Sequence, residues 1–404
     1  MALPGWVGRL CVAALVCLAV PTLASQVDTG EQVFNKIWGP DEGLGPHFNT
    51  SSCVSCHLNG GRGAPPTEAG APSDSTTIKL GVLPASETEA GKLLTRVISS
   101  FPEPIYGHQL QTHTTDGSAP EGTFTVTYRD RQVQLSDATI TLREPVLSVS
   151  ATGRGAVTPG VLTSPRIANS LFGLGLLEAI PEKDILAKAD VEDEDGDGIS
   201  GKPNMIRDAV SGKILLGRFG WKSGQPTVRQ QNAAAFSLDM GLTTSLFLKG
   251  GNTPEVSDPV LDALTAFTNT LPVPKGQPSP DAEAGKRLFH EAGCAACHTP
   301  THTTKDGTTI HPYTNLLLHD MGDELADRFL EGDADYWEWR TPPLWGIGRN
   351  SDVNGNGFFL HDGRARTLLE AILWHGGEGK KARDAVAAMT ARERDQLIAF
   401  LNSL

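Results

Sequence analysis

Two short cysteine motifs constrain this chain more than any other feature of its sequence. In each motif two residues separate a pair of cysteines and a histidine follows at once; the residues are Cys53, Cys56 and His57 in the first motif and Cys294, Cys297 and His298 in the second. This spacing is the attachment signature of c-type haem. The thiols bond to the vinyl groups of the porphyrin, and the adjacent imidazole is the proximal ligand of the iron. The sequence therefore predicts two covalently bound haems, with the two histidines as iron ligands.

The motifs have three other chemical interpretations, which the sequence favours less. Disulfides of this spacing would close very short loops and would constrain the unfolded chain little. A structural zinc site would require the two distant pairs to meet, and a thiol redox motif requires free thiols. The chain has two further cysteines, Cys11 and Cys17. Both lie in the segment that we expect to be removed.

The first 24 residues have the pattern of a secretory signal peptide. Arg9 ends a short charged start, an apolar core follows, and Thr22-Leu23-Ala24 resembles a cleavage site with small residues. An uncleaved anchor is the alternative. No later window holds the ~18 uninterrupted apolar residues of a spanning helix. We therefore expect an exported, periplasmic protein with no membrane span once the signal is cleaved.

The charge of the chain is acidic. Its 404 residues contain 34 Lys and Arg against 47 Asp and Glu, a formal net charge of −13. A nucleic-acid binder would need basic stripes on its surface, so we expect no nucleic-acid partner. The balance suits a basic protein partner or a small neutral substrate.

Three short segments recur in the same order in the two halves of the chain. They are a Gly-to-Phe segment, a Leu-x-Gly-x-Gly segment and an apolar segment with helical spacing, beginning at Gly30, Leu171 and Leu264 in the first half and at Gly285, Leu344 and Leu397 in the second. Apolar residues at this spacing form one face of a helix. The repeats therefore predict two copies of one haem domain.

The expected fold class is mainly α, with two cytochrome c-like haem domains in tandem. They would span residues 25–271 and 281–404, joined by the proline-rich linker 272–280. β-Branched alternation over residues 123–149 predicts a small β-sheet, placed in an insertion of the N-terminal domain at about 100–150.

A second insertion, residues 193–204, resembles the calcium loop of an EF-hand. Such a loop takes side-chain oxygens at positions 1, 3 and 5 and a backbone carbonyl at position 7. Asn204 stands at position 12, where an EF-hand has a bidentate Glu, so a solvated acidic turn is the alternative. The candidate Ca²⁺ ligands are Asp193, Asp195, Asp197 and the carbonyl of Ile199.

Five longer stretches, scattered along the mature chain, carry a resemblance to a known family. They are residues 48–53 (FNTSSC), 60–66 (GGRGAPP), 174–181 (LGLLEAIP), 340–348 (RTPPLWGIG) and 359–367 (FLHDGRART). The chain resembles the bacterial di-haem cytochrome c peroxidase superfamily, most closely its di-haem oxidoreductase branch. The resemblance implies an exported enzyme with two haem domains that reduces hydrogen peroxide with electrons from a small donor protein, of the cytochrome c or cupredoxin type.

The resemblance also implies roles for single positions. In the family the C-terminal haem takes in electrons, and its far-side ligand follows a His-Asp-Gly motif, which points to His375 here. The glutamine and glutamate that move protons at the peroxide site correspond to Gln231, or its neighbour Gln230, and to Asp239. The aromatic residue between the haems corresponds to Trp221.

Peroxide chemistry needs an open coordination position, which we expect on the N-terminal haem. Family members that require reductive activation close this position with a histidine soon after the first motif, and no histidine lies between His57 and His108. We therefore expect an open or water-bound iron at His57, with His108, His113 or Met240 as alternative ligands. Two other functions stay open: a di-haem enzyme that oxidises a protein or organic substrate, and a non-enzymatic di-haem electron carrier.

Overall fold

The computed structural model describes residues 22–66, 74–96, 99–151, 153–248 and 253–404. Most of the expected signal peptide, including Cys11 and Cys17, lies outside these residues. Within them, none of the helices combines the length and the apolar character that crossing a bilayer requires.

The expectation of a mainly α fold is wrong, because the chain has a mixed α/β fold. The described residues are 32% helical and 18% strand, and the strands form several small sheets rather than one insertion. The strands expected within residues 123–149 are present, but further strands form in short stretches that were not predicted, such as 76–81 and 162–167. The second of these contains Pro165 and lies at the edge of its three-stranded sheet, where a missing N–H is tolerated.

Short helices separated by long loops make up the helical part. In the first half they are α1 (Leu23–Asn35), η1 (Pro40–Glu42), α2 (Cys53–Cys56), η2 (Leu58–Gly60), α3 (Glu87–Leu94), α4 (Leu174–Glu178), α5 (Glu182–Leu186), α6 (Val228–Asp239) and α7 (Asp258–Thr270). In the second half they are α8 (Ala282–Glu291), η3 (Cys294–Ala296), η4 (Ile347–Arg349), α9 (Asn350–Asn354), α10 (Leu368–Leu373), η5 (Gly377–Gly379), α11 (Lys380–Ala388) and α12 (Ala391–Asn402).

Most strands pair only with one partner, and the observed pairs are antiparallel. The strands are β1 (His47–Phe48), β2 (Thr76–Gly81), β3 (Gln109–Leu110), β4 (His113–Thr114), β5 (Gly122–Gln134), β6 (Thr139–Ala151), β7 (Leu162–Ile167), β8 (Met205–Arg207), β9 (Ile214–Leu216), β10 (His302–Thr303), β11 (Thr309–Ile310), β12 (Leu318–Asp320) and β13 (Glu338–Arg340). The three-stranded sheet has the order β3-β2-β7, and the other pairs are β1-β4, β5-β6, β8-β9, β10-β11 and β12-β13.

The first and last helices of each half cross at a glycine. A Cβ atom at Gly30 of α1 would overlap the carbonyl oxygen of Ala263 in α7, and one at Gly285 of α8 would overlap that of Gln396 in α12. Only glycine permits such a close approach of two backbones. The two glycines begin the repeated sequence segments, so equal segments make equal contacts in the two halves.

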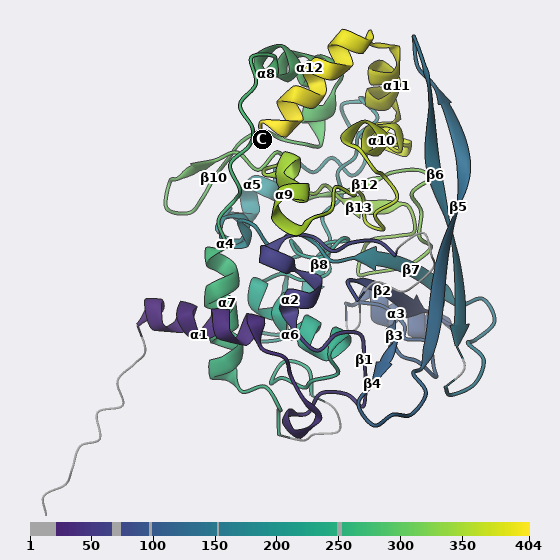
Figure 1. Cartoon of the computed structure of the whole chain (residues 1–404), viewed down its shortest axis with the longest axis vertical. Coiled ribbons are helices and arrows are strands. Elements are labelled where there is room, and N and C mark those ends of the chain that lie inside the picture. Colours follow the sequence, from purple (N-terminus) through teal and green to yellow (C-terminus); the bar gives the residue numbers. More distant parts are fainter. Residues whose placement is uncertain (1–21, 67–73, 97–98, 152, 249–252) are drawn as a thin grey trace, which may run out of the picture.

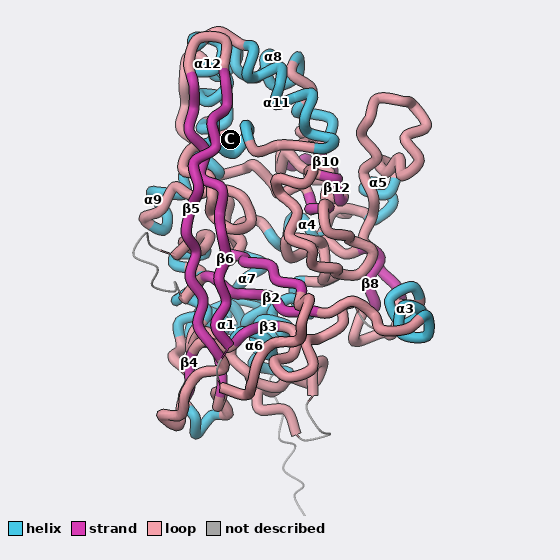
Figure 2. The backbone as a smooth tube through the Cα atoms, turned by 90° about the vertical axis from the view of Figure 1, so that its right-hand side faces the viewer, coloured by secondary structure: helices cyan, strands magenta, loops and turns pink. Residues whose placement is uncertain are grey.

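The β5–β6 hairpin joins the two halves of the molecule along one side (Figures 1 and 2). Its register runs from Gly122 opposite Ala151 to Gln134 opposite Thr139. The tip reaches the C-terminal helices, where the amide of Ser136 donates to the carbonyl of Ala387 at 3.0 Å. The hairpin therefore spans both halves instead of forming a local sheet on the first.

The hydrophobic cores also cross the expected boundary between the halves. The largest cluster is built on the C-terminal helices and includes Leu135, Leu142, Ile167 and Trp221 from the first half. Another cluster packs Leu174 and Leu177 of α4 against Ile310, Leu317 and Trp345 of the second half. Side chains of the two halves are therefore buried against each other.

Candidate functional site

The first cysteine motif lies on a single helical turn. Ser52 is the N-cap of α2, and its side chain accepts a hydrogen bond from the amide of Ser55. The imidazole of His57 donates from Nδ1 to the carbonyl of Gly61 at 3.3 Å, and burial lowers its pKa. The imidazole is therefore neutral, and its Nδ1 is held by a backbone carbonyl.

The second motif has the same arrangement. The imidazole of His298 donates from Nδ1 to the carbonyl of Tyr313 at 3.0 Å. Burial, followed by the nearby charge of His375, lowers the pKa of His298 to about 3. His298 is therefore neutral, and His375 lies close to it.

His375 follows the end of α10 and repeats this geometry a third time. Its Nδ1 donates to the carbonyl of Ala371 at 2.8 Å, and burial lowers its pKa. Burial keeps the imidazole neutral and the hydrogen bond leaves Nε2 as the remaining ligand atom.

These histidines fit the role of haem ligands. A metal-ligating histidine usually donates its other ring N–H to a carbonyl or carboxylate, which fixes the tautomer, and only the neutral imidazole binds a metal. His57, His298 and His375 each meet both conditions. No disulfide joins the motif cysteines of the described chain, Cys53, Cys56, Cys294 and Cys297, which thioether formation also requires.

A cavity of about 270 Å³ adjoins the first motif and brings several predicted residues together. Part of its wall comes from the first motif and α6, and part from the second half of the chain. Its lining includes Cys53, Cys56, His57, Trp221, Gln231, Ala235, Asp239 and Met240 from the first half and Glu331, Arg340, Pro342, Trp345 and Asn350 from the second.

Gln231 and Asp239 both face this cavity, at opposite ends of α6. The Oδ1 atom of Asp239 accepts a hydrogen bond from Gln109 Nε2 at 2.7 Å, which orients the carboxylate. Gln230 is used differently, because its Oε1 accepts from the amide of Ala209 at 2.7 Å and it does not line the cavity. Of the two adjacent glutamines, only Gln231 adjoins the first motif.

The alternative ligands for the first iron separate into two groups. Met240 lines the cavity and is 2% exposed. His108 pairs with Ser100 at 3.0 Å, His113 stacks on Phe48, and neither belongs to the cavity lining. Among the three candidates, the structure brings only Met240 to the first motif.

Trp221 lies in a turn whose backbone conformation is repeated in the turn that contains His361. Phe219 pairs with Gln225 across the first turn, and Phe359 pairs with Ala365 across the second. The backbone turns left-handed at equal places, with φ of 81° at Gly220 and 70° at Leu360. Sequence reasoning did not find this repeat, because the two turns share almost no residue types.

Each turn accepts a backbone hydrogen bond from the last residue of a strand in the opposite half of the chain. The amide of Arg340 donates to the carbonyl of Trp221 at 3.0 Å, and the amide of Ile167 donates to the carbonyl of His361 at 2.8 Å. In addition, the indole N–H of Trp221 donates to the carbonyl of Ile167 at 2.8 Å. Trp221 is therefore fixed at the junction of the two halves, against the cavity on one side.

The same repeat assigns a counterpart to His375. Thr367 caps α10, and His375 is the eighth residue after it; Thr227 caps α6, and the eighth residue after it is Ala235. Ala235 lines the cavity. At the position that carries an imidazole in the second half, the first half therefore carries a methyl group.

Sequence reasoning missed a set of charged residues that also line the cavity. They are Arg62, Lys79, Arg166, Glu331 and Arg340. Arg62 and Arg340 stand inside two of the family-like stretches, 60–66 and 340–348, so a signal was present. Nothing in the sequence indicates that residues so far apart share one cavity.

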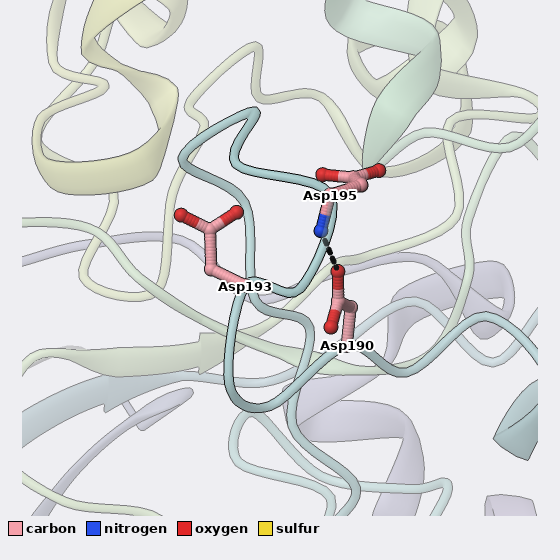
Figure 3. A group of neighbouring side chains, drawn as sticks. All are labelled: Asp190, Asp193 and Asp195. Atoms are coloured by element: carbon pink, nitrogen blue, oxygen red, sulfur yellow. Dashed lines mark hydrogen bonds between the residues drawn. The ribbon is translucent and has the colours of Figure 1, made fainter.

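The acidic loop brings together a different set of carboxylates from the one expected. Asp190, Asp193 and Asp195 place ligand oxygens within 4.8 Å of one another. Figure 3 shows these side chains around the loop, with the amide of Asp195 bonded to Asp190. Asp197 lies outside this group and accepts a hydrogen bond from the amide of Ile199 at 2.7 Å; its expected role as a Ca²⁺ ligand stays a prediction.

Comparison with known proteins agrees with the motifs. The family model described as "Di-haem oxidoreductase, putative peroxidase" matches residues 124–252 and 248–404. No curated protein matches the chain. Two solved structures are similar at low level: hydrazine synthase from Kuenenia stuttgartiensis, at 14% identity over 100% of both chains with a TM-score of 0.40, and a MauG-like protein associated with microbial copper homeostasis, at 16% identity over 58% of this chain and 89% of that chain with a TM-score of 0.31. Neither structure bears on the function of this chain, because both TM-scores are below 0.5.

Proposed function

The chain belongs to the di-haem oxidoreductase family, a family of di-haem redox enzymes, and from that premise we propose that it is an exported peroxidase of the periplasm. In this proposal both haems are attached covalently, hydrogen peroxide is reduced at the haem on His57, and electrons enter through the haem on His298. When bound, the haem irons supply the redox chemistry. The protein supplies ligands, proton-transfer groups and control of access.

The proposal rests mainly on Ala235, which occupies in the first half the position that His375 occupies in the second. In the second half, His298 and His375 lie near each other and would both hold the iron of the second haem. In the first half the equal position is a methyl group on the cavity wall. The first site therefore retains space for a small substrate where the second is filled by a side chain.

Gln231 and Asp239 are the residues that would handle protons in the cavity. Reduction of peroxide to water requires a proton to move between the two oxygens, which a positioned carboxylate can accept and return. Gln109 holds the carboxylate of Asp239 in place at 2.7 Å. Gln231 adds an amide on the same helix, able to donate or accept a hydrogen bond.

Trp221 supports the proposed passage of electrons between the two sites. It lines the cavity of the first motif and also packs into the core cluster of the second half. Its ring is held by the bond from Nε1 to Ile167. An aromatic ring fixed at this junction shortens the distance that an electron must cross without an intermediate carrier.

The electron donor in this proposal is a small protein of the cytochrome c or cupredoxin type. A net charge of −13 would attract a basic donor through long-range electrostatics. Turnover with such a donor would then slow as salt screens the attraction. Turnover independent of ionic strength would contradict the electrostatic part of this proposal.

Calcium is proposed at the acidic loop, with Asp190 joining Asp193 and Asp195. The loop continues into Ser200, whose hydroxyl donates to Glu378 at 2.6 Å, in the segment just after His375. Chelation of calcium should therefore change the spectrum of the second haem. Asp190→Asn should weaken calcium binding in titration calorimetry, and an unchanged affinity would remove the site.

The test of the main proposal combines haem content, spin state and turnover. Protein purified from the periplasm should contain two haems per chain by the pyridine haemochrome assay, and its mass should include both. The oxidised protein should show a high-spin ferric signal that changes rapidly with peroxide, and peroxide consumption should depend on a reduced donor protein.

Two other functions predict different results in these measurements. Two low-spin haems that do not react with peroxide would identify a non-enzymatic electron carrier. A peroxide reaction without donor-dependent turnover would identify an enzyme that oxidises a protein or organic substrate. Either result would overturn the peroxidase proposal.

A further inference from the structure

Two guanidinium groups in the cavity of the first motif have no carboxylate partner among the described residues. Arg340 is 6% exposed, and burial alone lowers its pKa to about 10. Arg62 is half-buried, burial alone lowers its pKa to about 10, and its Nε atom is enclosed without a hydrogen-bond partner. A buried cation without a partner is unfavourable, so both groups point to an anion in this cavity.

The other charges that line the cavity are already compensated. Arg166 forms ion pairs with Glu331 at 2.6 Å and with Asp327 at 3.3 Å. Asp327 also forms an ion pair with Lys222 at 2.8 Å. Lys79 and Asp239 are linked through the side chain of Gln109. Two positive charges therefore remain, and they belong to Arg62 and Arg340.

Backbone carbonyls hold both guanidinium groups in place. Arg62 donates from Nη2 to the carbonyl of Leu360 at 3.1 Å, and Arg340 donates from Nε to the carbonyl of Gly220 at 2.9 Å. Leu360 and Gly220 occupy the same position in the two repeated turns. These bonds use only part of the five N–H donors of each guanidinium, which leaves donors for a ligand.

We propose that Arg62 and Arg340 bind the two propionate carboxylates of the haem on His57. The inference rests on the haem site that the proposed function uses. A haem carries two propionates, which match the two uncompensated charges in number and sign. Arginine suits this role because its planar fork binds a carboxylate through two hydrogen bonds.

The assignment also places the propionate end of this haem beside Trp221. The guanidinium of Arg62 lies over the Trp221 ring, 5.3 Å from its centroid. Arg340 is bonded through its amide to the carbonyl of the same tryptophan. The two arginines therefore position the haem edge against the residue that links the two halves.

Removing either charge should change the electrochemistry of the first haem only. Arg62→Leu and Arg340→Leu should shift its midpoint potential to more negative values in a spectroelectrochemical titration, because a nearby cation stabilises the reduced haem. The propionate bending bands in the resonance Raman spectrum should shift as well. Arg62→Lys and Arg340→Lys keep the charge and should retain most of the wild-type potential.

Arg218→Leu is the matched control. Arg218 is also 6% exposed, and it also donates to backbone carbonyls, those of Leu177 and Ile180, but it lies outside the cavity lining. Its removal should leave the first potential unchanged.

The proposal is overturned by leucine variants that load two haems and keep the wild-type potential and Raman bands. If a leucine variant fails to fold, the lysine variants decide. Lysine keeps the charge but lacks the two-bond fork of arginine, so the propionate bands should shift although the potential is kept, and unshifted bands in both lysine variants would also overturn the proposal. Wild-type turnover is measured separately. A protein that binds two haems but does not reduce peroxide would refute the proposed function while the potentials still test the arginines.

Discussion

Trp221 and His361 meet edge to face, with ring centroids 6.4 Å apart and planes inclined by 76°. They hold equal positions in two repeated turns, and each turn is bonded to a strand of the opposite half. The two turns share one backbone conformation but carry different side chains, and these side chains have different surroundings. Trp221 adjoins the cavity of the first motif, whereas His361 stacks on Trp339 at 3.8 Å within the second half.

His375 should be the second axial ligand of the haem on His298. We expect a low-spin bis-histidine signal in low-temperature EPR of the oxidised protein, and His375→Ala should abolish it. His375→Met should raise the potential of this haem, since histidine–methionine ligation favours the reduced state. An unchanged EPR signal in the alanine variant would remove His375 from the iron.

Ala235→His should close the first site. The imidazole would stand where His375 stands in the second half, so the high-spin signal of the first haem should become low-spin and peroxide turnover should fall to background. Ala235→Val adds bulk without a ligand atom and serves as the control, with the high-spin signal retained. A histidine variant that stays high-spin would contradict the proposed equivalence of the two helices.

Asp239→Asn should lower peroxide turnover by roughly 10² to 10⁴, the usual contribution of a positioned acid–base group. The asparagine keeps the bond partner of Gln109, so haem content and the EPR spectrum should not change. Gln230→Ala is the control, because Gln230 lies outside the cavity. Equal turnover in wild type and Asp239→Asn would exclude this carboxylate from proton transfer.

Asp327→Asn should destabilise the protein strongly. Asp327 is buried between Arg166 and Lys222, and its loss leaves Lys222, which is fully buried, without a counter-charge. Breaking such a pair typically costs about 3–5 kcal/mol, measurable by urea denaturation. Asp384→Asn removes an exposed partner of Lys380 and should cost about 1 kcal/mol or less.

His361 should make stability depend on pH below neutrality. Burial lowers its pKa from 6.5 to about 4, so the folded state resists protonation. This contribution is complete above pH 6.5 and is lost as the pH falls towards 4, by about 3 kcal/mol. Denaturation of His361→Phe should show a smaller loss over this range, whereas the exposed His290→Phe should follow the wild type.

The two candidate haem motifs could be found in the sequence because local chemistry fixes the spacing of their residues. Cys53, Cys56 and His57 must lie on one turn to hold a porphyrin edge, and that turn forms. His375 could be placed only through the family resemblance. The role of Arg340 could not be inferred, because its partner site is built by residues almost three hundred positions earlier in the chain.

The fold class was mispredicted for a related reason. Alternation revealed β5 and β6, where one face is buried and the other exposed. Strand β2 alternates only between buried and half-buried positions and ends with two buried residues, so its contrast is weaker, and it pairs with the distant β7. Pairing between segments far apart in sequence leaves no local pattern to detect.

The shared wall of the first cavity has a consequence for how the protein matures. Glu331, Arg340 and Asn350 close a site whose thiols are made much earlier. Because a chain is synthesised from its N-terminus, Glu331, Arg340 and Asn350 are added after Cys53 and Cys56, so the first motif stays accessible until the second half has been made and folded. The order in which the first cavity can be assembled therefore follows from the order of its lining residues in the chain.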